Sequence, residues 1–145
     1  MTTTDTATHR GILIEADQLQ HVAVPADQTW KAIQQAIGAR NFDVVRCRDG
    51  IDLYVDDEGA INGAPFNLPL TIIAHALGHS AALFGSALAL TADAEGDTQG
   101  LSDEQAQAVT DAIGQKPSSE VVDAVVATLS VHPAFLPIIA MLRSI

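Results

Sequence analysis

The fold is decided by residues 50–59, GIDLYVDDEG. Ile51, Leu53 and Val55 alternate with other side chains, which is typical of a β-strand with a buried face. The strand runs directly into the acidic residues 56–58 and then Gly59. Acidic side chains next to glycine are favoured in turns, so the segment predicts a strand that ends in an acidic turn.

A second run, residues 42–47, precedes this strand and alternates in the same way. Between the two runs stands Asp49-Gly50, a dipeptide that strongly favours a β-hairpin. The sequence therefore predicts an antiparallel hairpin of residues 42–47 and 51–55.

Further elements flank the hairpin upstream. Residues 10–16 and 20–24 are short apolar runs separated by polar residues, which predicts two strands joined by a tight turn. Asp27 stands in an N-cap position before apolar residues at helical spacing, and Gly38 ends that pattern. We expect an amphipathic helix between them.

Downstream of the hairpin the pattern changes to helix and then back to strand. Asn67 is placed to cap a helix with Pro69 in its first turn, and Gly78 is expected to end it. Residues 83–91 alternate weakly and run into the polar residues 93–97, which predicts a strand followed by a loop.

The remaining chain reads as helix. Ser102 and Gln105 fit the capping-box pattern ahead of apolar residues at helical spacing. Apolar helical segments follow after Ser118 and after Pro133. We predict an α+β fold in which a small mixed or antiparallel sheet of about five strands carries two helices. Residues 10–100 would form the core domain, and residues 101–145 a C-terminal helical extension packed on it.

Composition narrows the possible partners. The chain has 145 residues, 48% of them hydrophobic, and a net charge of −11. Residues 51–145 hold twelve acidic residues and only Lys116 and Arg143 as bases. Nucleic-acid binding requires clustered Lys and Arg, so we expect no direct contact with DNA or RNA. No apolar window reaches the roughly 20 residues of a membrane span, and no signal peptide is visible, which predicts a cytoplasmic protein.

The acidic turn is the first candidate site. Asp56, Asp57 and Glu58 could contact a ligand together with Phe66 and Asn67 of the loop beside them. Gathered carboxylates suit a hard cation or general acid–base chemistry, but they are equally the residues that a solvated turn favours. The turn is the preferred interpretation.

A metal site is the second candidate. His75 and His79 stand at i and i+4, a spacing that places two imidazoles on one helix face. The glutamate that would follow the first histidine is replaced by Ala76, and Gly78 interrupts the helix.

Cys47 lies in a strand pattern and is expected to be a buried reduced thiol. We expect no cofactor, because the chain contains no phosphate-binding glycine loop and no nucleophile elbow.

Four segments resemble a known family of small domains, the domain-of-unknown-function family numbered 3846. The resemblance covers about residues 10–105 and is carried by residues 54–59, 65–67, 84–90 and 101–105. Members of the family occur largely in bacteriophages, plasmids and bacterial genomes and are not known as enzymes. The resemblance implies a phage or mobile-element accessory protein, and it assigns no functional residue.

These observations favour a binding module that engages a host protein or a small ligand. One alternative is a metal-dependent hydrolase that uses His75 and His79. Another is an acidic DNA mimic that occupies a nucleic-acid-binding protein. The apolar residues at the C-terminus further predict a homodimer through the C-terminal helices; they are Ile138, Ile139, Met141, Leu142 and Ile145.

Overall fold

The computed structural model describes residues 8–58, 63–79, 83–113, 119–130 and 135–143. Gly59, Ser118, Pro133 and Ile145, used above, lie outside these ranges. The elements in chain order are β1 Thr8–Ile14, β2 Leu19–Pro25, α1 Thr29–Ile37, β3 Phe42–Arg46, the short 3₁₀ turn η1 Arg48–Gly50, β4 Ile51–Asp56, α2 Leu68–Ala76, β5 Ala87–Ala92, β6 Thr98–Gln99, α3 Asp103–Ile113, α4 Ser119–Leu129 and α5 Leu136–Arg143.

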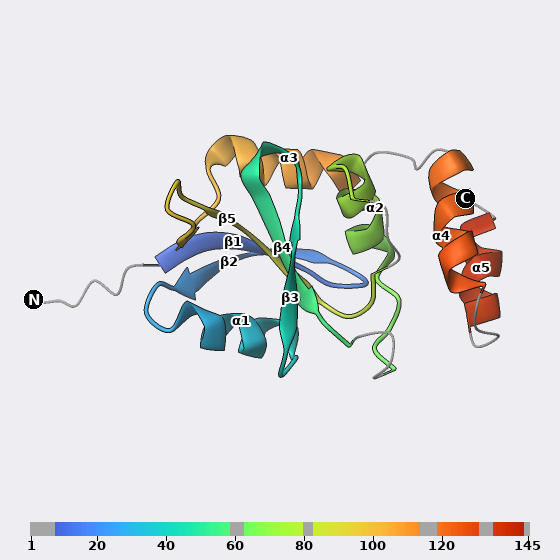
Figure 1. The fold of residues 1–145 in the computed structure, drawn as a ribbon, viewed down its shortest axis with the longest axis horizontal. Coiled ribbons are helices and arrows are strands. Elements are labelled where there is room, and N and C mark those ends of the chain that lie inside the picture. The colour runs from blue at the N-terminus through green and yellow to red at the C-terminus, as the bar shows by residue number, and fades with distance from the viewer. Residues whose placement is uncertain (1–7, 59–62, 80–82, 114–118, 131–134, 144–145) are drawn as a thin grey trace, which may run out of the picture.

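The strands form one sheet in the order β2-β1-β5-β4-β3, with β6 also paired to β5. Each of these pairings is antiparallel. Figure 1 shows α1 on one side of the sheet and α2 and α3 on the other, while α4 and α5 stand together at one end. The predicted α+β class is confirmed, and the alternatives of a mixed or an antiparallel sheet resolve to an antiparallel one.

The predicted β-hairpin forms from β3 and β4, and the turn between them sets the register of the two strands. The Cys47 amide donates to the Ile51 carbonyl at 2.8 Å, and Asp49 and Gly50 adopt left-handed conformations with φ of 60° and 74°. Pairing then continues from Arg46 opposite Asp52 to Phe42 opposite Asp56. Because β3 is the last strand in the order formed by the described residues, this hairpin forms one edge of the sheet.

Each face of the sheet supports its own hydrophobic cluster. On the α1 face the cluster contains Ile33 and Ile37 of the helix against Tyr54, Leu88 and Leu90 of the central strands. The opposite face buries a larger cluster under α2 and α3, with the following fully buried members: Ile14, Ile51, Leu53, Leu70, Ile73, Ala74, Ala87, Ala89 and Val109. Burial on both sides explains why β5 is apolar along nearly its whole length, whereas β4 includes the buried Asp52.

Asn67 holds the start of α2 against the sheet. Its side-chain oxygen accepts from the Leu70 amide at 3.0 Å, which confirms the predicted N-cap. The amide nitrogen donates to the carbonyls of Ile14 at 3.0 Å and Gly85 at 2.8 Å. The residue is 0% exposed, so one side chain fixes β1, α2 and the segment before β5 from inside the protein.

Two details of the predicted elements were wrong. The N-cap of α1 is Gln28 and not Asp27, because Gln28 takes a left-handed conformation and the helix turns from its carbonyl. The strand expected over residues 83–91 begins only at Ala87. Gly85 has a φ of 77°, which breaks the extended chain, and Phe84 makes an isolated bridge to Phe66 before it.

The capping box of α3 is confirmed and has a second role. The Ser102 hydroxyl accepts from the Gln105 amide, and the Gln105 side chain accepts from the Ser102 amide. Gln105 also donates to the Asp49 carbonyl at 2.8 Å, so α3 is tied to the tip of the hairpin. The first helix of the region expected as a C-terminal extension is therefore bonded to the core domain.

The pair α4 and α5 forms a third hydrophobic cluster with the segment around Phe84. Its buried members are Phe84, Val125, Val126, Leu129, Ile139 and Leu142. Phe84 stacks on Phe135 with ring centroids 5.2 Å apart and meets Phe66 edge-on at 5.4 Å. Within the described ranges, no helix combines the length and apolarity needed to cross a membrane.

We predict that Asn67→Ala lowers the free energy of unfolding by about 3 kcal/mol, because it leaves two buried carbonyls and one amide without their partner. Urea unfolding of both proteins measures this difference. Asn41→Ala is the matched control, since Asn41 is exposed, and it should change stability by less than about 0.5 kcal/mol. Equal effects of the two substitutions would contradict the central role of Asn67.

Candidate functional site

A cleft of about 390 Å³ lies beside the acidic turn on the edge hairpin. We call it the acidic cleft. It is lined by Asp43, Val44, Val45, Arg46, Val55, Asp56, Asp57, His79, Leu83 and Phe84. Two strands and the segments that follow α2 therefore contribute to one hollow.

The hairpin register determines which side chains enter the cleft. Asp43 is paired with Val55, and Val45 lies two residues from Asp43 on the same face of β3. Val45 and Val55 belong to the cluster under α2 and α3, so they form an apolar floor on that face. The Asp57 amide bonds to the Asn41 carbonyl at 3.3 Å and extends the ladder into the acidic turn.

The opposite wall is positioned by the end of α2. Gly78 has a φ of 99° and donates to the His75 carbonyl, while the His79 amide reaches back to Ala74 at 2.8 Å. These two bonds form a Schellman motif, which reverses the chain after a helix. The Arg48 amide donates to the Leu77 carbonyl at 2.9 Å, so this helix end is also bonded to the hairpin.

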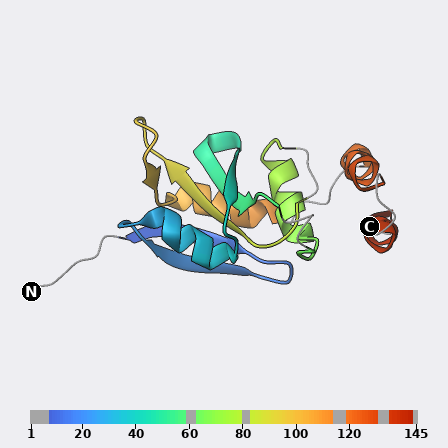
Figure 2. The same ribbon diagram turned by 60° about the horizontal axis from the view of Figure 1, so that its bottom comes forward.

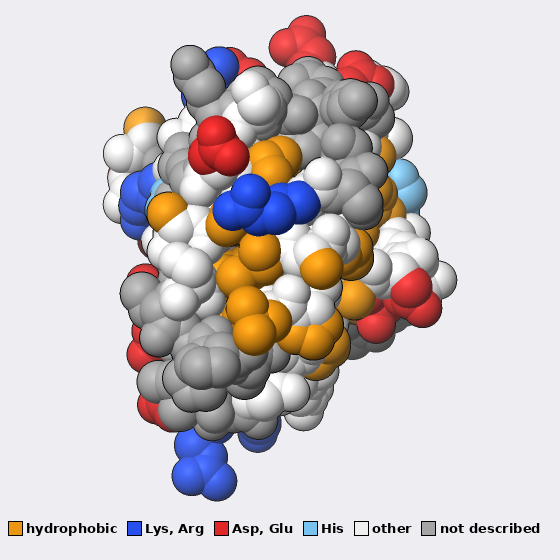
Figure 3. All heavy atoms as spheres, turned by 90° about the vertical axis from the view of Figure 1, so that its right-hand side faces the viewer, with side chains coloured by type: hydrophobic (Ala, Val, Ile, Leu, Met, Phe, Trp, Pro, Cys, Tyr) orange, Lys and Arg blue, Asp and Glu red, His pale blue; other side chains and the backbone are white. Residues whose placement is uncertain are grey.

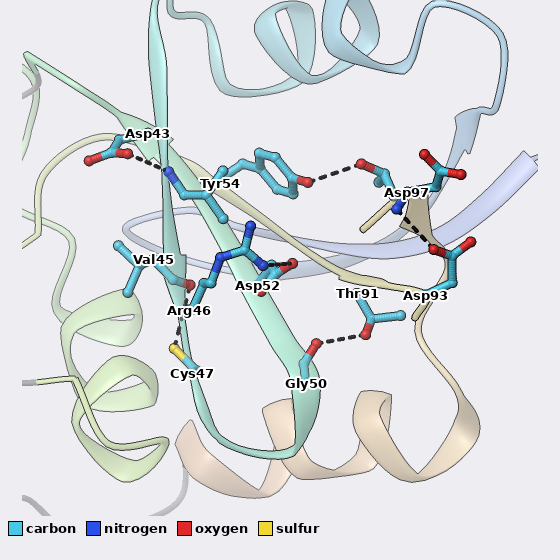
Figure 4. A network of polar contacts seen from close by, with 12 residues as sticks. Asp43, Val45, Arg46, Cys47, Gly50, Asp52, Tyr54, Thr91, Asp93 and Asp97 are labelled. Carbon is cyan, nitrogen blue, oxygen red and sulfur yellow. Dashed lines mark hydrogen bonds and ion pairs between the residues drawn. The ribbon is translucent and has the colours of Figure 1, made fainter. Parts of the chain in front are cut away.

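The cleft is negatively charged, because Arg46, the one arginine or lysine among its lining residues, points away from it. Strand alternation places Arg46 on the α1 face, where its guanidinium lies 3.6 Å from the Asp52 carboxylate (Figure 4). By the same alternation Asp56 lies on the side of Arg46, so the carboxylates directed to the cleft with His79 are those of Asp43 and Asp57. One Asp43 oxygen accepts from the Val44 amide at 2.8 Å, and one Asp56 oxygen accepts from the Glu58 amide at 2.9 Å.

The predicted site residues are only partly brought together. Asp56 and Asp57 line the acidic cleft, and Glu58 lines a second hollow of about 300 Å³ with Arg40, Asn41 and Asp56. Phe66 packs into the third hydrophobic cluster. Asn67, expected to contact a ligand, is corrected to a structural residue, because it is fully buried and bonded to backbone groups.

Asp43, Leu83 and Phe84 were missed from the sequence. Asp43 could have been found, because a hairpin closed by Asp49-Gly50 places it opposite Val55 and beside the acidic turn. Leu83 and Phe84 had no such signal. Their position depends on the left-handed Gly85 and on the bridge to Phe66.

The two histidines lie on different structural elements. α2 ends at Ala76, so His75 is in the helix and His79 is beyond it. Burial, followed by the charge of His79, lowers the pKa of His75 from its ordinary value. Its Nε2 atom is buried and has no hydrogen-bond partner among the described residues. Across those residues, no group of three or more His, Cys, Asp or Glu side chains is arranged to hold a metal ion.

Two other polar groups near the hairpin have structural explanations. Burial raises the pKa of Asp52, and the charge of Arg46 partly opposes that shift. Asp93 accepts from the Asp97 amide, as Figure 4 shows, and also from the Glu95 amide and the Gln99 side chain. Those bonds hold the pKa of Asp93 below its usual value and close the loop predicted over residues 93–97.

Comparison with known proteins identifies the family. The family model described as a domain of unknown function (DUF3846) matches residues 9–114. The chain belongs to this family. No curated protein and no solved structure matches it. The DUF3846 match contains α1 to α3, every residue of the acidic cleft and the whole sheet except Thr8 at the start of β1, whereas α4 and α5 follow after it.

We predict that acid destabilises the protein partly through His75. The folded protein binds this proton less readily than the unfolded chain, so stability is complete above the ordinary pKa of 6.5 and is lost as the pH falls below it. Between about pH 7 and pH 5 the free energy of unfolding should fall more steeply for the natural protein than for His75→Gln. The exposed His21 provides the control, and an equal slope for His75→Gln and His21→Gln would refute the assignment.

We predict that Cys47 is unreactive in the folded protein. Burial, together with the Asp52 charge, raises the pKa of its thiol to about 11. Roughly one thiol in a thousand is then ionised at about pH 8, and the thiolate is the reactive form. Alkylation followed by mass spectrometry should be slow until urea unfolds the chain; rapid labelling of the folded protein would contradict this.

Proposed function

We propose that this protein acts by binding and not by catalysis, and that its acidic cleft takes a lysine or arginine side chain of a partner protein. The observation that supports this is the combination of two carboxylates, those of Asp43 and Asp57, with an apolar floor. Long basic side chains have the same two parts, an aliphatic stem and a cationic end.

The dimensions and chemistry of the cleft fit such a ligand. Its volume of about 390 Å³ falls within the range of about 300–1,000 Å³ in which small-ligand sites are found. The stem would pack on Val45, Val55 and Leu83, and the cation would meet Asp43 and Asp57. Charge-assisted hydrogen bonds to carboxylates are stronger than neutral ones, which gives the site selectivity for a base.

The setting we propose is the interaction of a phage or plasmid protein with a protein of its bacterial host, in takeover of the host or against its defences. This rests on the family resemblance. Steering of basic partners by the excess negative charge of the chain supports it, since a net charge of −11 attracts cations at a distance.

The other two functions remain predictions. For the hydrolase, His75 and His79 supply two ligands of the kind that zinc uses, but the described residues add no third. For the DNA mimic, acids would have to follow one face at close spacing. Asp103 instead pairs with Arg10, and Asp93 is occupied by its own loop.

We predict that Asp43→Asn combined with Asp57→Asn weakens binding of a short Lys- and Arg-containing peptide by about tenfold or more, because the cation loses two carboxylate partners. Isothermal titration with this peptide, and with the same peptide carrying glutamine at its basic positions, measures the effect.

The matched control is Asp27→Asn combined with Asp97→Asn, which changes the net charge equally at two exposed positions outside the cleft. This control should leave the affinity within about twofold. If both pairs of substitutions weaken binding to the same extent, the attraction is due to net charge and the cleft is not the site.

A further inference from the structure

The pair α4 and α5 exposes an apolar surface at the end of the molecule that is distant from α1 (Figures 1 and 2). Figure 3 shows this end, where hydrophobic side chains surround a basic one. We call this surface the hairpin face, after the helical hairpin of α4 and α5, which is separate from the β-hairpin of β3 and β4. Its exposed residues are Asp123 and Ala127 of α4 and Leu136, Pro137, Ala140, Met141 and Arg143 of α5.

The exposure is not a consequence of loose packing. The other sides of the same helices are buried in the third cluster, with Val125, Leu129 and Leu142 at 1–3% exposure. Leu136 is nevertheless 61% exposed and Met141 41% exposed. Leu136 and Ala140 stand at helical spacing with Met141 beside them, so α5 has a second, mainly apolar side that the core does not cover and that ends in Arg143.

We propose that the hairpin face binds a second copy of this chain and forms a two-fold symmetric dimer. The charges of the surface support a copy of itself as the occupant. α5 contains no Asp or Glu in a chain of net charge −11, so two copies can approach here without facing carboxylates on that helix.

The hairpin face also contains a complementary pair of charges. Asp123 and Arg143 are both exposed, and neither forms an ion pair among the described residues. The two helices run antiparallel (Figure 1), which brings the end of α5 level with the first half of α4. A two-fold axis parallel to α4 and α5 places the end of α5 in one copy level with the first half of α4 in the other. Arg143 of each copy then faces Asp123 of the other.

The size of the surface determines the expected strength. An 11-residue helix is about 16 Å long, and two helices side by side are about 20 Å wide. The resulting area is well below the roughly 800 Å² per partner of a standard stable interface. We therefore expect a dimer that dissociates on dilution.

Sedimentation equilibrium of the full chain over a range of concentrations tests the proposal. The natural protein should rise from monomer to dimer mass, and Leu136→Asp should remain monomeric with an unchanged melting temperature, since the position is solvent-exposed in the monomer. Trp30→Asp is the matched control: Trp30 is 57% exposed on α1, and its replacement should leave dimerisation unchanged. A natural protein that is monomeric throughout, or a Leu136→Asp variant that still dimerises, overturns the proposal.

Charge reversal tests the arrangement within the dimer. Arg143→Asp should raise the dissociation constant by about tenfold, because two symmetric pairs become repulsive. The double variant Arg143→Asp with Asp123→Arg should restore dimerisation, and failure to restore it overturns the two-fold arrangement. Asp43→Asn with Asp57→Asn should dimerise normally, so this proposal and the binding function of the cleft can fail separately.

Discussion

The buried side chain of Asn67 is the constraint on which the rest of the structure depends. Apolar burial holds the sheet and helices together, but it does not set where α2 begins. Asn67 sets it by joining the helix start to β1 and to the chain before β5 through three hydrogen bonds. Unmet polar groups inside a protein are costly, so this position leaves little freedom for the segments it joins.

The acidic cleft follows from that constraint at the other end of the same helix. With α2 fixed at its start, its C-terminal reversal at Gly78 places His79 opposite the edge hairpin. The bond from Arg48 to Leu77 fixes the distance between helix and hairpin. The cleft is therefore built on strands and a helix end and not on a free loop, which gives its carboxylates defined positions.

Phe84 connects the cleft to the last two helices. It lines the acidic cleft and also stacks on Phe135 in the third cluster. The family domain thus packs on the two added helices partly through a residue that also lines the cleft. Because α4 and α5 lie beyond the DUF3846 match, the domain and its added helices have distinct roles in the two proposals: one binds a partner and the other binds a second copy.

Local signals in the sequence determined the hairpin, the N-cap of α2 and the capping box of α3. Each depends on residues close together in the chain, such as Asp49-Gly50, whose backbone preferences act without tertiary contacts. Asn67 was identified as a cap, but its bonds to Ile14 and Gly85 depend on segments far away in the chain. The meeting of Asp43 and Asp57 with His79 likewise exists only after folding, and only the tertiary structure showed which side of α5 remains exposed.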